Sequence, residues 1–278
     1  MPSPRARRAG SLRQPVILLY VAVAALYGLA AWLRRPGAPA PAPSLPAAII
    51  ALALVVHAVT VVHAVFTPDG IDLSFPQALS LVAWLTVLVA VVSGLFAKLP
   101  AAGNVILPVA AACALVPLAG GAPHRFAYAG ETIAAAHIAV ALVGYALFTV
   151  AALQALLLAG LEKRLHSGIT RPESDGALPL LTLERFLFRL VAAGFVLLTL
   201  TIASGLVFSE EVFGKPVTFT HKSVFSVLGW ATFAILLFGR WRYGWRGRRA
   251  LYWIIAGTLL LILGYLGSKF VSQVVLGR

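Results

Sequence analysis

Apolar residues fall in long runs along this chain, and each run ends at a short polar, charged or proline-containing segment. An α-helix rises about 1.5 Å per residue, so runs of this length cross a hydrocarbon core about 30 Å thick. The fold class that follows is all-α, a polytopic membrane protein with a bundle of eight transmembrane helices. The predicted spans are 16–33, 45–65, 76–97, 102–119, 132–160, 187–208, 219–239 and 250–275.

The polar segments between the runs divide the chain further. Residues 1–14 form a basic N-terminal tail, and residues 15–278 form the eight-span membrane domain. The connection over 161–186 is the longest. At its end, residues 180–190 carry leucine and phenylalanine at helical spacing, with Glu184, Arg185 and Arg189 elsewhere on the helical wheel. This amphipathic pattern predicts a short interfacial helix that leads into the sixth span.

Composition agrees with a membrane protein and excludes several other classes. Hydrophobic residues make up 60% of the chain and charged residues 11%, against about 25% charged in a soluble domain. The net charge of +13 comes from cations that flank apolar runs, so the predicted partner is the lipid bilayer and not nucleic acid. The single cysteine, Cys113, lies inside an apolar run and excludes a disulfide framework or a thiolate metal site.

Orientation follows from the cations in alternate loops, because cytoplasmic loops carry an excess of Lys and Arg. One set of loops holds thirteen cations and the opposite set holds four. We therefore predict a multi-pass protein of the bacterial inner (plasma) membrane with both termini outside. The first set holds Arg34, Arg35, Lys98, Lys163, Arg164, Arg171, Arg185, Arg189, Arg240, Arg242, Arg246, Arg248 and Arg249; the second holds Arg125, Lys215, Lys222 and Arg278.

Histidines in or beside the spans are the candidate functional residues, since an ionisable group in the bilayer interior is costly. In the predicted topology His63, His137 and His221 lie toward the outer ends of their spans, and His57 lies near mid-membrane. A neutral imidazole there can ligate haem iron or a divalent metal, and it can equally be a hydrogen-bonded packing residue. No nucleophile–base pair or pair of carboxylates lies within a span, so we predict no catalytic residues and no enzyme.

Three stretches of the chain resemble the integral-membrane cytochrome c assembly superfamily, which includes CcsA, CcmC and HemX-like proteins, and in particular its YpjD-type branch. The resemblance extends over residues 45–276. It rests on His137 with the apolar stretch that follows it, on residues 181–208 with Leu-Glu-Arg before a span, and on residues 244–270 with Gly-Trp-Arg-Gly-Arg-Arg before the last span. It implies a non-enzymatic protein that binds or handles haem on the outer face. The implied partners are other cytochrome c assembly or membrane-complex subunits.

The resemblance assigns roles to individual residues. His137 matches the histidine that precedes the superfamily's tryptophan-rich motif, His221 occupies the place of the motif's end, and Trp230 matches a tryptophan in the next span. The chain departs from the pattern at residues 209–220, which contain no Trp, and at Phe238, where a histidine is expected. The haem ligands implied are His137 and His221, with His57 and His63 as further cofactor-binding candidates. Two alternatives stay open, namely an accessory protein of divalent-metal transport and a structural or regulatory subunit of another membrane complex.

Overall fold

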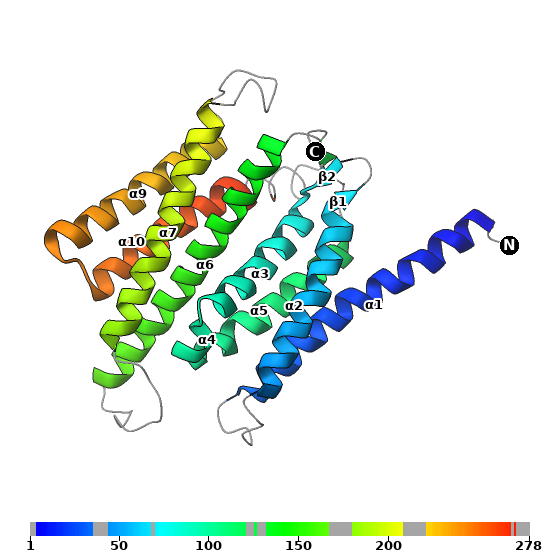
Figure 1. Ribbon diagram of the computed structural model, residues 1–278, viewed down its shortest axis with the longest axis horizontal. Helices are drawn as coiled ribbons and strands as arrows, with labels where there is room; N and C mark the ends of the chain where they lie inside the picture. The colour runs from blue at the N-terminus through cyan, green and yellow to red at the C-terminus, as the bar shows by residue number, and fades with distance from the viewer. Residues whose placement is uncertain are drawn as a thin grey trace. The chain divides into compact units, whose positions relative to one another are not determined.

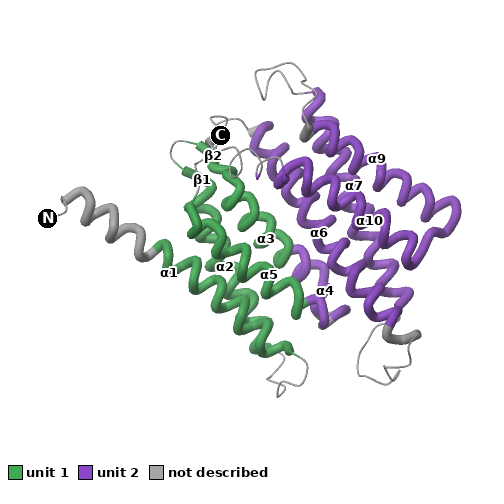
Figure 2. Tube along the Cα trace, turned by 180° about the vertical axis from the view of Figure 1, so that it is seen from behind, with its two compact units in different colours: residues 1–88, 103–126 green, residues 89–102, 127–278 purple. Residues whose placement is uncertain are grey.

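A computed structural model describes residues 4–35, 44–67, 70–120, 125–126, 132–166, 180–207, 221–267 and 270. Helices account for nearly all of these residues, and the chain divides into two compact units (Figure 2). The first unit holds residues 1–88 and 103–126, and the second holds 89–102 and 127–278. Among the described residues, seven helices are long and apolar enough to cross a membrane. The predicted class, an all-α polytopic membrane protein, is confirmed.

The described residues of the first unit form four apolar helices and a small sheet (Figure 1). Helix α1 packs against α2 and α5, and the antiparallel sheet has the order β1-β2-β3 with Ile71 opposite both Phe66 and Phe126. Strands this short carry no periodic signal, so the sequence did not predict them. The elements are α1 (Pro4–Leu33), α2 (Ser44–Val65), β1 (Phe66–Thr67), β2 (Gly70–Asp72), α3 (Phe75–Val92), α5 (Gly103–Leu115), the 3₁₀ turn η2 (Val116–Ala119) and β3 (Arg125–Phe126).

In the part of the second unit that the structure describes, four long helices run alternately up and down (Figure 1). Helix α6 packs along α7, α9 along α10, and α10 against α6. The short connection between α9 and α10, residues 244–246, makes these two helices antiparallel neighbours. The elements are α4 (Leu95–Lys98), the 3₁₀ turn η1 (Pro100–Ala102), α6 (Thr132–His166), α7 (Leu180–Val207), α9 (His221–Tyr243), α10 (Gly247–Ile262) and the π-helical turn η4 (Leu263–Gly267).

Three helix boundaries differ from the predicted ones, and each difference has a local cause. Helix α3 ends at Val92 instead of residue 97, because Gly94 adopts a left-handed conformation with φ of 67°. The predicted span 102–119 is a shorter apolar helix, α5, that passes into the turn η2 at Val116, directly before Pro117. The predicted interfacial helix is not separate from the sixth span: no proline or glycine lies between Leu180 and Val191, and α7 is continuous.

The core of the second unit is centred on two stacked phenylalanine rings. Phe148 on α6 and Phe233 on α9 lie with their centroids 3.9 Å apart and their planes 16° apart. Gly194 on α7 faces Phe148, and Gly257 on α10 faces Phe233, each so closely that an added Cβ would lie 3.0 Å or less from the ring. Glycines at these two positions let all four helices approach one aromatic pair.

Replacing Gly257 with alanine is expected to lower the thermal unfolding midpoint of the detergent-purified protein. The new methyl group would lie 2.8 Å from Phe233, whose ring cannot retreat because it stacks on Phe148. Overpacking of this kind costs about 1–3 kcal/mol. Gly160→Ala is the matched control, because nothing lies within 4 Å of its added Cβ. Equal midpoints for the two variants would contradict this description of the core.

Candidate functional site

His137 lies in the second turn of α6 and contacts α7. Its Nδ1 is 2.8 Å from the hydroxyl oxygen of Ser204, and both side chains are half-buried. An added Cβ on Gly205 would lie 3.4 Å from Cε1 of the ring, so the glycine lets α7 pass close to the imidazole. Two helices therefore fix the position of this histidine.

Ser204 holds the His137 ring through Nδ1. The Ser204 hydroxyl also lies 3.1 Å from the backbone carbonyl of Thr201, one turn earlier on α7. A hydrogen bond at one ring nitrogen orients an imidazole in the way that is found for metal-ligating histidines.

The first residue of α9, His221, lies at the same end of the unit as His137. Helices α6 and α9 are joined by a hydrogen bond between the side chains of Tyr145 and Ser226. Tyr145 lies eight residues beyond His137 and Ser226 five beyond His221, which at 1.5 Å per residue is about 12 Å and about 7.5 Å of helix. Measured along the helix axes from this hydrogen bond, His137 and His221 therefore lie at similar depths. The end of the unit formed by His137, Ser204 and His221 is called the histidine end below.

Trp230, which the resemblance also singles out, lies between α9 and α7. Its indole Nε1 donates a hydrogen bond to the Thr199 hydroxyl at 2.9 Å, and its ring stacks on Phe195 with centroids 5.7 Å apart. The stacked pair of Phe148 on α6 and Phe233 on α9 lies one helical turn further from the histidine end than Trp230. Trp230 thus joins α7 to α9 below the histidine end.

His57, in contrast, belongs to the first unit and is completely buried there. Its Nδ1 lies 3.3 Å from the Tyr27 hydroxyl and its Nε2 lies 3.0 Å from the Ser80 hydroxyl. The ring also meets the Tyr27 ring edge to face, with centroids 5.7 Å apart. These contacts join α1, α2 and α3. With both ring nitrogens engaged by hydroxyl groups, the geometry favours hydrogen-bonded packing at this position.

His63 is less constrained than His57 and His137. His63 lies in the last turn of α2 and is exposed. Among the described residues, no three His, Cys, Asp or Glu side chains converge in a way that could hold a metal ion. Two further ionisable residues, Asp69 and His124, lie outside the described residues.

At the opposite end of the second unit, the Leu-Glu-Arg segment lies close to the Gly-Trp-Arg-Gly-Arg-Arg segment. Glu184, of the Leu-Glu-Arg segment, accepts a hydrogen bond from Arg240 at 3.1 Å, and the two side chains are 16% and 20% exposed. Arg240 also donates to the carbonyl of Trp245 at 3.1 Å and lies over the ring of Phe188, 4.5 Å from its centroid. This end, formed by Glu162, Glu184 and residues 240–249, is called the basic end below.

Two glycines of the Gly-Trp-Arg-Gly segment form the turn between α9 and α10. Gly244 and Gly247 have φ of 64° and 55°, left-handed values that favour glycine. The turn places the Trp245 ring against Gly239 and stacks it on Trp253. It also brings the start of α10 next to α6, since an added Cβ on Gly247 would lie 3.9 Å from the carboxylate of Glu162. The glycine spacing therefore follows from the geometry of this turn.

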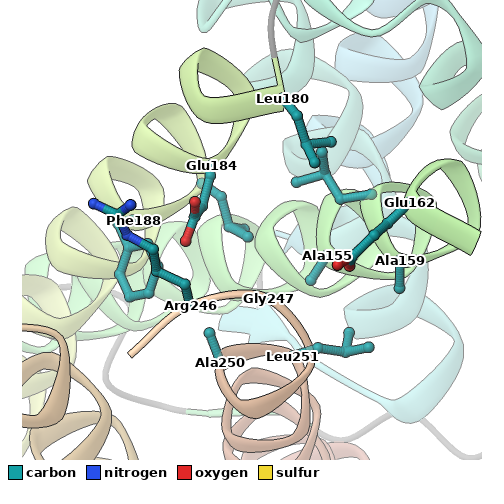
Figure 3. Close-up of a pocket in the computed structure, with 12 residues that line it drawn as sticks. Ala155, Ala159, Glu162, Leu180, Glu184, Phe188, Arg246, Gly247, Ala250 and Leu251 are labelled. Carbon is teal, nitrogen blue, oxygen red and sulfur yellow. The ribbon is translucent and has the colours of Figure 1, made fainter. Parts of the chain in front are cut away.

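A cavity of about 200 Å³ lies among α6, α7 and α10 at the basic end (Figure 3). Its walls are apolar, from residues such as Leu158, Leu187 and Ala250. Its charged lining residues come from three different elements: Glu162 from α6, Glu184 from α7 and Arg246 from the turn before α10. Reasoning from the sequence missed this cavity, because its walls are ordinary apolar residues of separate spans.

Comparison with known proteins gives matches over most of the chain. Residues 46–276 match the family model described as Cytochrome C assembly protein. The chain is similar to the inner membrane protein YpjD of Escherichia coli strain K12, with 32% identity over 231 residues, 81% of this chain and 85% of that protein. It is also similar to the cytochrome c biogenesis protein CcsA of Heterosigma akashiwo, with 31% identity over 105 residues, 38% of this chain and 33% of that protein. With CcsA of Gloeobacter violaceus it shares 34% identity over 92 residues, 33% of this chain and 27% of that protein. No solved structure matches the chain.

Proposed function

Since this chain belongs to the cytochrome c assembly protein family, we propose that it binds haem at its histidine end and handles it during cytochrome c assembly, without catalysing a reaction. The observation that supports this most is the hydrogen bond between His137 Nδ1 and Ser204, which holds an imidazole in place near the end of an apolar helix. The names of its relatives, one an inner membrane protein and others cytochrome c biogenesis proteins, agree with the proposal.

The donor set at this end fits haem. His137 supplies one imidazole, and His221 at the start of α9 supplies the second in our proposal. Haem iron, when bound, offers axial positions that imidazole nitrogens fill. Ser204 keeps the His137 ring in one orientation, and Gly205 lets α7 pass close to the ring. We leave His57 out of this ligand set because hydroxyl groups engage both of its ring nitrogens. We retain His63 only as a site of transient contact with haem.

Removing the Ser204 hydroxyl is expected to weaken haem binding while leaving α7 folded. Loss of a group that orients a metal ligand costs about 10–100-fold in metal affinity. Ser204→Ala should therefore bind haem more weakly and shift the haem reduction potential, while Ser204→Thr, which retains the hydroxyl, should restore both. Haem titration followed by absorbance and a redox titration measure these effects. Identical affinity and potential in the alanine variant would exclude this role for Ser204.

We further propose an inner-membrane location with both termini outside, which places the histidine end on the outer face and the basic end in the cytoplasm. The excess of cations in the loops that include residues 240–249 supports this orientation. An alkaline phosphatase fused after residue 245 is expected to be inactive, and one fused after residue 278 active. Activity of the first fusion would reverse the topology and move the proposed haem site to the cytoplasm.

A further inference from the structure

Helices α6 and α9, which carry His137 and His221, lie diagonally across the second unit from each other. Helix α6 packs against α7 and α10, and α9 packs against the same two helices (Figure 1). Ridge-into-groove packing fixes the distance between adjacent helices, but it does not act directly across a diagonal. The spacing of α6 and α9 therefore depends on side chains that reach across the unit.

At least two side-chain contacts cross from α6 to α9. One is the stacked pair of Phe148 and Phe233 in the core. The other is the hydrogen bond between the side chains of Tyr145 and Ser226. Both helices begin at the histidine end, and Tyr145 and Ser226 precede the phenylalanines on their helices. The hydrogen bond is therefore the contact that lies nearer the histidine end.

A third helix holds the Tyr145 side chain in place. Tyr265, in the π-helical turn η4 at the end of α10, has its ring centroid 5.6 Å from that of Tyr145, with the ring planes 34° apart. Both rings are half-buried, so the Tyr265 ring limits the positions that the Tyr145 hydroxyl can reach. Turns of π-helix within longer helices occur frequently at functional sites. The bond to Ser226 is thus formed from a tyrosine that α6 and α10 both constrain.

We propose that Tyr145 and Ser226 are positioning residues, whose hydrogen bond fixes the spacing of α6 and α9 and so allows His137 and His221 to coordinate one haem iron together. This inference rests on the proposed haem site. Groups that bind one ligand together must be held within about 0.5 Å of the required geometry. The bond lies within roughly 12 Å of helix from either histidine, so a change in the spacing there moves one imidazole away from the iron.

Variants of the two hydroxyl groups test the proposal in the haem-loaded full-length chain. Tyr145→Phe keeps the ring against Tyr265 and removes only the hydroxyl, and Ser226→Ala removes the other half of the bond. Each should convert part of a six-coordinate low-spin haem to the five-coordinate high-spin form, detected by absorption and electron paramagnetic resonance. Each should also lower haem affinity about tenfold, the lower end of the effect of groups that orient metal ligands.

Controls separate the hydrogen bond from the loss of a hydroxyl group in general. Ser226→Thr keeps a hydroxyl and should restore the low-spin spectrum. The double variant of Tyr145→Phe and Ser226→Ala should bind haem no more weakly than either single variant, because both remove the same interaction. Tyr252→Phe is the matched control, since Tyr252 lies exposed on α10.

A distance measurement on the haem-free chain tests the spacing without any ligand. Ile133 and Val224 are exposed in the first turns of α6 and α9. Nitroxide labels on Ile133→Cys and Val224→Cys, in a chain that also carries Cys113→Ala, report the distance between the two helices by electron paramagnetic resonance. We expect one narrow distance distribution, which Tyr145→Phe should broaden.

An unchanged low-spin spectrum in Tyr145→Phe would overturn the inference, and a fall in its unfolding midpoint would then limit the bond to a structural role. A high-spin wild-type haem would also overturn it, because a single axial histidine requires no second helix at a set distance. A wild-type chain that takes up no haem would contradict the proposed function instead. The haem-free distances would then decide, since broadening in Tyr145→Phe supports the positioning role and an unchanged distribution overturns it.

Discussion

Purified protein carrying His137→Ala is expected to lose nearly all of the haem that the wild-type chain retains. The variant removes the imidazole that the hydrogen bond to Ser204 holds in place. The shorter side chain cannot reach the metal, so the Soret absorption per mole of protein should fall by more than the ~10–100-fold expected for an orienting group alone. Folding should be unaffected, because the ring is half-buried and lies near the helix end.

Two further variants make the His137 experiment specific. His137→Gly leaves space at the ligand position, so imidazole added to the buffer should restore the Soret band. His166→Ala, at the basic end of the same helix, should retain wild-type haem. An unchanged haem content and spectrum in His137→Ala would show that another residue holds the iron.

Breaking the ion pair at the basic end should have the largest effect on stability. In Glu184→Ala the Arg240 guanidinium stays against the Phe188 ring and the Trp245 carbonyl without its carboxylate. The expected cost lies between the ~1 kcal/mol of an exposed pair and the ~3–5 kcal/mol of breaking a buried one. The thermal unfolding midpoint of the purified protein, measured by circular dichroism, should fall by several degrees.

A double variant tests whether the loss comes from the unpaired charge. Glu184→Gln with Arg240→Gln removes both charges and should be more stable than Glu184→Ala, because no unpaired guanidinium remains. Arg242→Gln, which changes an exposed cation of the same turn, should leave the midpoint unchanged. If Glu184→Ala also melts at the wild-type temperature, the ion pair has no structural importance.

The helices could be predicted because a bilayer imposes one strong requirement on them. A segment that crosses it must be apolar over its whole length, and such runs are visible in the sequence without knowledge of the packing. Helix ends were harder to predict. The stop at Val92 depends on the left-handed Gly94, and a glycine inside an apolar run does not reveal its conformation. The continuity of α7, in contrast, agrees with the sequence, which has no proline or glycine between Leu180 and Val191.

The candidate site was only partly visible from the sequence. His137 stood out because an ionisable residue within an apolar run is costly and rare. Ser204 did not, since serine in such helices usually bonds its own backbone, and its contact with His137 joins residues 67 positions apart. The pairing of Glu184 with Arg240, 56 positions apart, depends on helix packing in the same way. The sequence shows which groups are unusual, and the fold determines which of them meet.

The most direct test of the proposed function is the haem content of the wild-type chain, measured with a pyridine haemochrome assay after expression with abundant haem and purification in mild detergent. We predict a stoichiometry near one haem per chain and a Soret band typical of histidine ligation. A wild-type protein that contains no haem, and does not take up added haem, would contradict the proposal.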